Sequence, residues 1–397
     1  MTNAHKDALF VLVKSLSKSE KRQFKLYVGR LGVNTDAKFL ALFNLMDKIK
    51  VYDEKLILEN GIVKKAQLSN LKAHLYKQIL VSLRLNPVNQ NIRVQIREQL
   101  DFATILYQKG LYKQSLKILD KAKATAIENE EKNVAYEIVE FEKLIETQYI
   151  TRSIPDRADE LAVQAKQLSA QNVITSKLSN LALQLYGQML KIGYVRSDED
   201  IKRVQKYFEK HMPKYKMEDL GFREKLWLYK AHLWYSFLTQ DFLSCYKYSS
   251  KWVDLFYDNK EMIYLNPVFF LKGNHYLLES LFYVKYSSQF KETLEKLEKI
   301  VGSKEFPDND NIASLAFLYI NLNKLNLHFL EGNFEKGLYL VKIVEYGINK
   351  HKDRIDQHHV MVLYFKIACL YFGYGDNKTC IQYLKRIINN KNLKMRE

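Results

Sequence analysis

The residue types best suited to metal chemistry gather between positions 351 and 359 of this 397-residue sequence. The group comprises His351, Asp353, Asp356, His358 and His359. Asp356 and His359 are three residues apart, so on a helix they would share a face and could supply two ligands. No third or fourth ligand has the spacing to join them, and an acidic residue at a helix start also favours the positive end of the helix dipole. The pattern therefore predicts a solvated helix start and no metal site.

Other signals of catalysis or cofactor binding are weak. Gly373, Tyr374 and Gly375 carry two glycines of a dinucleotide-binding loop, but the third glycine is missing and a helical segment precedes them where a strand is required. This segment is typical of a turn. The sequence contains no GxSxG, HExxH or GxxxxGK(S/T) motif. We expect neither catalysis nor a cofactor, with an enzyme whose residues converge from distant helices as a minor alternative.

Positive charge is concentrated near the N-terminus. The net charge is +17, and residues 1–90 hold 16 Lys and Arg against 7 Asp and Glu, which gives +9. Four cations are predicted on the solvent side of one amphipathic helix that starts after Ser17, namely Lys18, Lys21, Arg22 and Lys25. Such a basic patch attracts acidic proteins or phosphates. Nucleic acid therefore stays open as a partner.

Composition narrows the class of protein. Apolar residues make up 47% and charged residues 27% of the chain, as in ordinary folded proteins. The apolar stretch at 8–13 is too short for a secretory signal, and the longest apolar stretch, 312–322, is about half the length of a membrane span. The three cysteines lack the CxxC spacing of zinc sites and are odd in number, which favours a reducing compartment. We expect a cytoplasmic protein without membrane insertion.

A repeat organises the elements that must position any site. Seven times an apolar run, a short break and a second apolar run follow one another, at intervals of 43, 43, 44, 48, 44 and 43 residues. The breaks centre on Gly110, Ser153, Arg196, Gln240, Ser288, Gly332 and Gly375. The residue twelve places after each break is apolar in all seven repeats, as expected for a buried helix face. A period of this size is typical of a solenoid of helix pairs.

An N-terminal region precedes the repeats. In residues 1–88, Ser17 and Glu20 match a capping box, and a long helix is expected from Lys64 to Leu85. The repeats then occupy residues 89–397. The sequence thus predicts an all-α fold, with a small basic helical region followed by a helical-repeat solenoid.

The repeats resemble the tetratricopeptide-repeat family. The order of that motif is matched by Tyr107, Gly110, Tyr112, Ser115, Leu119 and Ala122, and again by Leu325, Gly332, Phe334, Gly337, Val341 and Val344. The period near 44 residues exceeds the family's 34, and the proline that usually closes each unit is missing. The resemblance implies a right-handed superhelix of about seven tetratricopeptide-like helix pairs.

The resemblance also implies a binding surface. In that family, particular positions of the first helix of each pair face a concave groove. In this sequence these positions are Arg97, Tyr107, Lys143, Tyr186, Trp227, Lys230, Trp234, His275, Lys285 and Asn326. Rings offer rigid contact area and cations offer charge complementarity, which suits an acidic peptide. We therefore expect a non-catalytic scaffold that holds a protein or peptide. The alternative is a nucleic-acid-associated regulator in which the basic region touches nucleic acid and the solenoid senses a ligand or partner.

Overall fold

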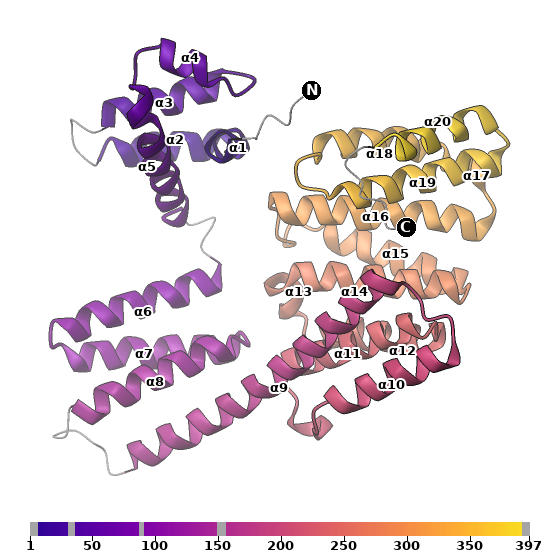
Figure 1. The fold of residues 1–397 in the computed structure, drawn as a ribbon. Helices are drawn as coiled ribbons and strands as arrows, with labels where there is room; N and C mark the ends of the chain where they lie inside the picture. Colours follow the sequence, from indigo (N-terminus) through magenta and orange to yellow (C-terminus); the bar gives the residue numbers. More distant parts are fainter. Residues whose placement is uncertain (1–6, 31–35, 87–90, 149–155, 391–397) are drawn as a thin grey trace. The chain divides into compact units, whose positions relative to one another are not determined.

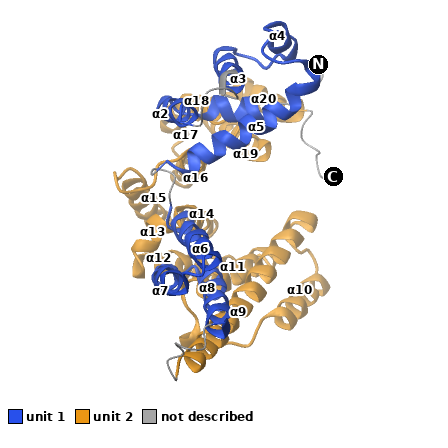
Figure 2. Ribbon diagram, turned by 90° about the vertical axis from the view of Figure 1, so that its left-hand side faces the viewer, with its two compact units in different colours: residues 1–152 blue, residues 153–397 orange. Residues whose placement is uncertain are grey.

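The computed structural model describes residues 7–30, 36–86, 91–148 and 156–390, and within these ranges the chain forms helices and turns without any β-strand (Figure 1). The predicted all-α class is confirmed. The chain divides into two compact units, residues 1–152 and 153–397 (Figure 2). This division falls near the predicted break at Ser153, so the first unit contains the N-terminal region together with the first repeat helices. Among the described helices, none has both the length and the hydropathy needed to cross a bilayer.

The N-terminal helices of the first unit enclose their own hydrophobic core. They are α1 (Ala8–Ser15), α2 (Lys18–Val28), α3 (Asp36–Lys48), α4 (Glu54–Glu59) and α5 (Lys65–Arg84). The predicted capping box is confirmed, because the Ser17 N–H donates to Glu20 Oε2 at 2.8 Å and the Glu20 N–H donates to Ser17 Oγ at 3.2 Å. One turn further on, the ring of Phe24 is buried against that of Phe43, with centroids 4.7 Å apart. Burial of the apolar side of α2 leaves its basic side on the surface.

Three longer helices complete the first unit. They are α6 (Ile92–Gln108), α7 (Tyr112–Glu128) and α8 (Lys132–Gln148). The break predicted at Gly110 is confirmed as a turn, and Gly110 has a left-handed φ of 72°. The small residue five places on, Ser115, is fully buried, and its hydroxyl donates to the Ala103 carbonyl at 2.8 Å. A small side chain at this position therefore lets α7 approach α6 closely.

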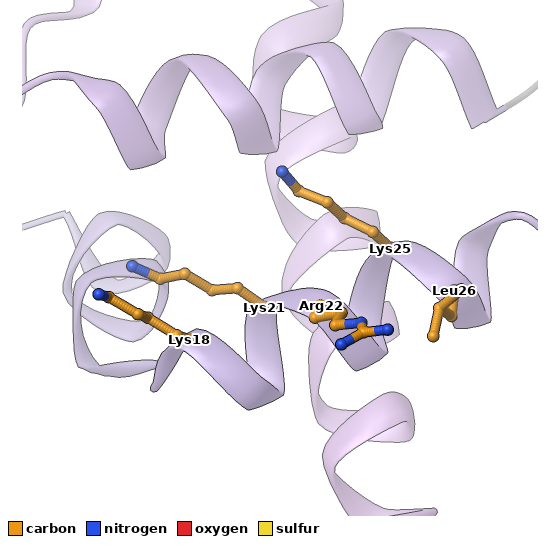
Figure 3. Close-up of a pocket in the computed structure, with 5 residues that line it drawn as sticks. All are labelled: Lys18, Lys21, Arg22, Lys25 and Leu26. Atoms are coloured by element: carbon orange, nitrogen blue, oxygen red, sulfur yellow. The ribbon is translucent and has the colours of Figure 1, made fainter.

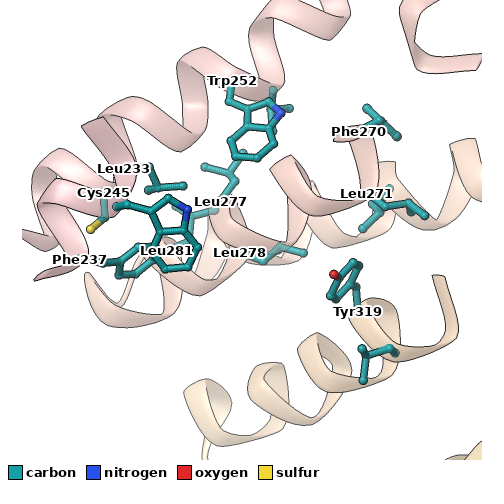
Figure 4. Close-up of a cluster of buried hydrophobic side chains, with 14 of the residues drawn as sticks. Leu233, Phe237, Cys245, Trp252, Phe270, Leu271, Leu277, Leu278, Leu281 and Tyr319 are labelled. Carbon is teal, nitrogen blue, oxygen red and sulfur yellow. The ribbon is translucent and has the colours of Figure 1, made fainter. Parts of the chain in front are cut away.

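The second unit is a succession of packed helices. They are α9 (Arg157–Ile192), α10 (Asp198–His211), α11 (Phe222–Leu238), α12 (Phe242–Asp258), α13 (Glu261–Leu265), α14 (Pro267–Tyr283), α15 (Ser287–Val301), α16 (Asp310–Glu331), α17 (Phe334–Gly337), α18 (Tyr339–Lys350), α19 (Gln357–Tyr374) and α20 (Asn377–Ile388), with a short 3₁₀ turn at Met217–Asp219. Each pair contacts the next, with α9 on α11, α12 on α14, α14 on α16 and α16 on α19. One continuous core links them, and Figure 4 shows part of it around Trp252 and Phe270, both fully buried.

Most of the predicted breaks in this unit are turns, but one was misplaced. Gln240, Gly332 and Gly375 adopt left-handed φ angles of 59°, 64° and 96° between consecutive helices. Ser288, in contrast, lies inside α15, and the turn is made three residues earlier by Lys285 with φ 59°. The prediction was wrong because two adjacent serines are typical of a loop, whereas Ser287 and Ser288 begin α15. Ser153 lies outside the described residues.

The prediction of a separate helix pair in every repeat was wrong at α9. Its 36 residues run unbroken from Arg157 to Ile192. The segment contains no proline, its one glycine is Gly187, and it is rich in Ala, Leu, Gln and Lys, which favour helix throughout. One helix therefore serves as the second member of one pair and the first member of the next.

Candidate functional site

The candidate site is a row of aromatic and basic side chains on consecutive helices of the second unit. Along α11, Trp227, Lys230 and Trp234 are spaced by three and four residues, so the helix places them on one face. The same spacing recurs on α14, which begins with Pro267 at a position where a proline fits a helix. We call the following set the aromatic-basic row: Tyr186, Trp227, Lys230, Trp234, Phe269, Lys272, His275, Tyr276 and Tyr319.

Ring contacts join these helices. The Tyr186 ring on α9 lies 4.7 Å from that of Trp234, which in turn lies 5.4 Å from Tyr276 on α14. The neighbouring His275 ring stacks on Tyr319 of α16, with centroids 4.5 Å apart and planes 11° apart. The row therefore extends without interruption from α9 to α16.

The predicted groove residues of the second unit differ in how far they are exposed to a partner. Six of the ten predicted residues lie in or beside the row, namely Tyr186, Trp227, Lys230, Trp234, His275 and Asn326. Trp234 and Asn326 are only 8% and 4% exposed, so they pack in the core and offer little surface to a partner. Trp227 and Lys230 are half-buried and remain accessible. Lys285 lies apart, in the exposed turn between α14 and α15.

Sequence reasoning missed several members of the row. Phe269, Lys272 and Tyr276 were not predicted, although each follows Trp227, Lys230 or Trp234 by 42 residues. The signal that could have found them is the repeat itself, because equivalent positions one period apart come to lie side by side. The contact between the Trp227 and Phe269 rings, with centroids 5.7 Å apart, shows this directly.

Lys230 is the most unusual cation of the row. Its Nζ lies 4.5 Å from the centre of the Trp227 ring and 5.7 Å from that of Phe269. Among the described residues, Lys230 forms no ion pair with a carboxylate. Burial and the positive charge of Lys272 lower the pKa of Lys230 to about 8. The site therefore holds two neighbouring cations without a counter-charge.

Next along α14, His275 and Glu279 form a polar contact that is not an ion pair. His275 Nε2 lies 3.9 Å from Glu279 Oε2, and His275 Nδ1 lies 3.3 Å from Asn323 Nδ2. Burial, together with the positive charges of His359 and Lys272, lowers the pKa of His275 to about 3, so its ring is neutral at pH 7. Burial raises the pKa of Glu279 to about 7, although Lys366 opposes the shift.

Lys366 of α19 is the third cation near the row. Its Nζ lies 5.1 Å from the centre of the Phe282 ring and 5.4 Å from that of Phe329. Burial lowers its pKa, against the opposing charges of Cys369 and Glu279. Lys230 and Lys366 are thus both desolvated lysines that lie over aromatic rings, but Lys366 has Glu279 nearby as an opposing charge.

Three predicted groove residues lie in the first unit. Arg97 and Tyr107 of α6 line a cavity of about 670 Å³, together with Glu137 and Phe141 of α8. Arg97 lies 3.9 Å from Glu137, so its charge already has a partner. Lys143 does not line this cavity, and its Nζ lies 2.8 Å from Glu140 Oε1.

The predicted basic patch lies on α2. Lys18, Lys21, Arg22 and Lys25 line a shallow hollow of about 410 Å³ together with Leu26. Lys18 and Lys21 extend in the same direction, whereas Arg22 points the other way beside Leu26 (Figure 3). Lys21 Nζ lies 2.7 Å from Asp47 Oδ1, so this charge is partly compensated. The cluster is therefore a surface of about three available cations.

No known protein-family model, curated protein or solved structure matches this chain. The case for a function therefore depends on the residues and their geometry.

The residues first considered for metal binding have other contacts. Within the described part of the chain, no three His, Cys, Asp or Glu side chains are arranged to hold a metal ion. His351 is buried, and its ring stacks on Phe317 at 5.3 Å. Asp356 caps α19 by accepting a hydrogen bond from the His358 N–H at 2.7 Å. The predicted role of Asp356 at a helix start is confirmed, and Gly375 ends the same helix in a left-handed turn.

Proposed function

We propose that the second unit is a non-catalytic scaffold that binds a segment of another protein along the aromatic-basic row. The observation that carries this proposal is a line of accessible side chains on successive helices, namely the exposed Tyr186 of α9, the half-buried Trp227 and Lys230 of α11, and the half-buried Phe269, Lys272 and Tyr276 of α14. Tyr186 and Tyr276 both contact the buried ring of Trp234, which holds them in place. Rings on successive helices form a rigid and extended surface, which loses little conformational entropy when it binds a partner.

We propose further that the helix pairs belong to a right-handed superhelix of the tetratricopeptide type, with longer helices than the family's regular members. Consecutive packing of the helices from α9 to α20 supports this view. The small residues after the breaks also support it, since Cys245 and Gly337 are buried where the second helix of a pair meets the first. In such an array the first helices of successive pairs line one face, which is where the row lies.

Trp227→Ala tests the scaffold. Trp227 is half-buried at the row, whereas Trp234 belongs to the core, so only the first can be removed without a large loss of stability. A tryptophan anchor typically contributes about 2 kcal/mol or more, so the affinity for the natural partner should fall by about 30-fold. The measurement is partner binding at endogenous concentration, with helicity followed by circular dichroism.

Tyr346→Ala is the matched control. Tyr346 is an aromatic residue of α18 that is 71% exposed and lies outside the row. Its loss should leave both binding and helicity unchanged. Undiminished partner binding by a folded Trp227→Ala variant would exclude the row as the binding surface.

The basic patch on α2 favours a second candidate function, association with nucleic acid. Lys18 and Arg22 form no ion pair with a described residue, and together with Lys25 they line an open hollow. Uncompensated cations around one open hollow are suited to phosphate groups. The rings that could stack on bases are not available on this face, because Phe24 is buried and the Tyr27 hydroxyl is bonded to Gln78 at 2.7 Å. This candidate is therefore weaker than the scaffold.

A further inference from the structure

We propose that Lys230 and Lys272 form a carboxylate subsite within the aromatic-basic row, and that it takes an Asp or Glu side chain of the bound segment. This inference rests on the proposed function, since it assigns the chemistry of one position along the same surface. The two lysines occupy equivalent positions on α11 and α14, 42 residues apart, and the same repeat brings the Trp227 and Phe269 rings beside them.

The subsite lacks the counter-charge that Arg386, another cation lying over a ring, possesses. Arg386, which lies 4.5 Å from the centre of the Tyr383 ring, also contacts Glu345 at 2.8 Å. Lys230 lies on two rings in the same manner, but the charged group acting most strongly on it is Lys272. Neither Lys230 nor Lys272 forms an ion pair with a described carboxylate.

Lys296 of α15 provides a second comparison. Its Nζ lies 3.8 Å from the centre of the Tyr257 ring, and its charge opposes the rise in the pKa of Asp254 that burial causes, so a carboxylate acts on it within the fold. Lys296 and Lys230 therefore both lie over rings, but only Lys296 has a carboxylate whose charge acts on it. A carboxylate placed between Lys230 and Lys272 would supply the missing charge and would restore the pKa of Lys230 towards its ordinary value.

The row also restricts the position of any second acidic residue in the bound segment. Glu279 follows Lys272 by seven residues on α14, which corresponds to about 10 Å along a helix. An extended segment covers that distance in about three residues. A second carboxylate there would lie close to Glu279. The preferred segment therefore has an acidic residue at the subsite, and the residue about three positions further towards Glu279 is not acidic.

Selection from a library of random ten-residue peptides tests the subsite on the full-length chain. Wild-type protein should enrich peptides with Asp or Glu at one fixed position. Lys230→Met with Lys272→Met should abolish this enrichment and should bind a selected peptide about tenfold more weakly. Lys296→Met should change neither result. The glutamine version of the selected peptide should bind wild type and double variant equally.

The other possible outcomes show whether the subsite alone fails or the scaffold fails with it. Enriched peptides that lack acidic residues, or acidic enrichment that persists in the folded double variant, would overturn the subsite and leave the scaffold standing. Failure of the wild-type protein to enrich any peptide would overturn the subsite and the scaffold together. An independent readout is the titration of Lys230 by NMR, in which the selected peptide raises the pKa and its glutamine version does not.

Discussion

Gly347→Ala should destabilise the second unit, although alanine is the better helix former. Gly347 is a buried residue of α18, and a Cβ there would meet Phe317 Cδ2 of α16 at 2.6 Å, with two further ring carbons closer still. Ordinary van der Waals contact begins at 3.4 Å, so the ring must move. It has little freedom to do so, because it stacks on His351 with centroids 5.3 Å apart.

The size of the effect follows from two opposing contributions. Replacing glycine by alanine inside a helix stabilises it by about 1 kcal/mol. Overpacking a buried site costs about 1–3 kcal/mol, and the overlap at Gly347 calls for the upper end of that range. We expect a net loss of about 2 kcal/mol in the free energy of unfolding.

The assay is urea unfolding followed by circular dichroism, with amide hydrogen exchange of α16 and α18 as the local readout. Phe317→Leu in the Gly347→Ala background should recover part of the loss, because the smaller side chain vacates the space that the new methyl group needs. The two changes should therefore be non-additive. Stability equal to or above that of the wild type in the Gly347→Ala variant would refute the packing argument.

Three further results are expected. Gly187→Ala, in α9 where no atom lies within 4 Å of the new Cβ, should raise stability by about 0.5–1 kcal/mol in the same urea assay, and a loss would contradict the helix-propensity argument. Burial raises the pKa of Glu142 to about 7 despite its 2.6 Å contact with Lys123, so the folded carboxyl holds its proton more tightly than the unfolded one. The stability of the first unit should therefore fall as the pH rises from about 5 to 7, and Glu142→Gln should remove that slope in urea titrations at several pH values. Reversal of the four cations of the basic patch to Glu should flatten the slope of log affinity for DNA against log salt by about 3 if three of them neutralise phosphates, whereas an unchanged slope would exclude the patch.

Local features of the fold could be predicted from the sequence. The capping box at Ser17 and the turns at Gly110, Gly332 and Gly375 depend on residues within about one helical turn of each other, and the chain displays them directly. The period near 44 residues extended this local information to a succession of paired helices. The period misled where it was imposed on α9, whose composition favours one unbroken helix.

The site was only partly predictable. Repeat register identified Trp227 and Lys230 as accessible members of one face, but it also selected Trp234, which the structure buries. The reason is that α11 is covered by α9, α10 and α12, so nearly every side chain of that helix meets a neighbour. Amphipathic spacing cannot reveal such burial, because no residue of α11 is fully exposed and its accessible side chains, Trp227 and Lys230 among them, are themselves half-buried.

The sequence by itself determined the helical class and most of the helix ends, because these depend on hydrogen bonds and spacings over a few residues, and its period near 44 residues indicated the succession of helix pairs. Only the tertiary structure decided which rings touch and which cations lose water. The lowered pKa of Lys230 illustrates this, since it comes from burial and from Lys272, 42 residues further along the chain. Burial and charge act through space, and packing of successive helices brings these distant residues together.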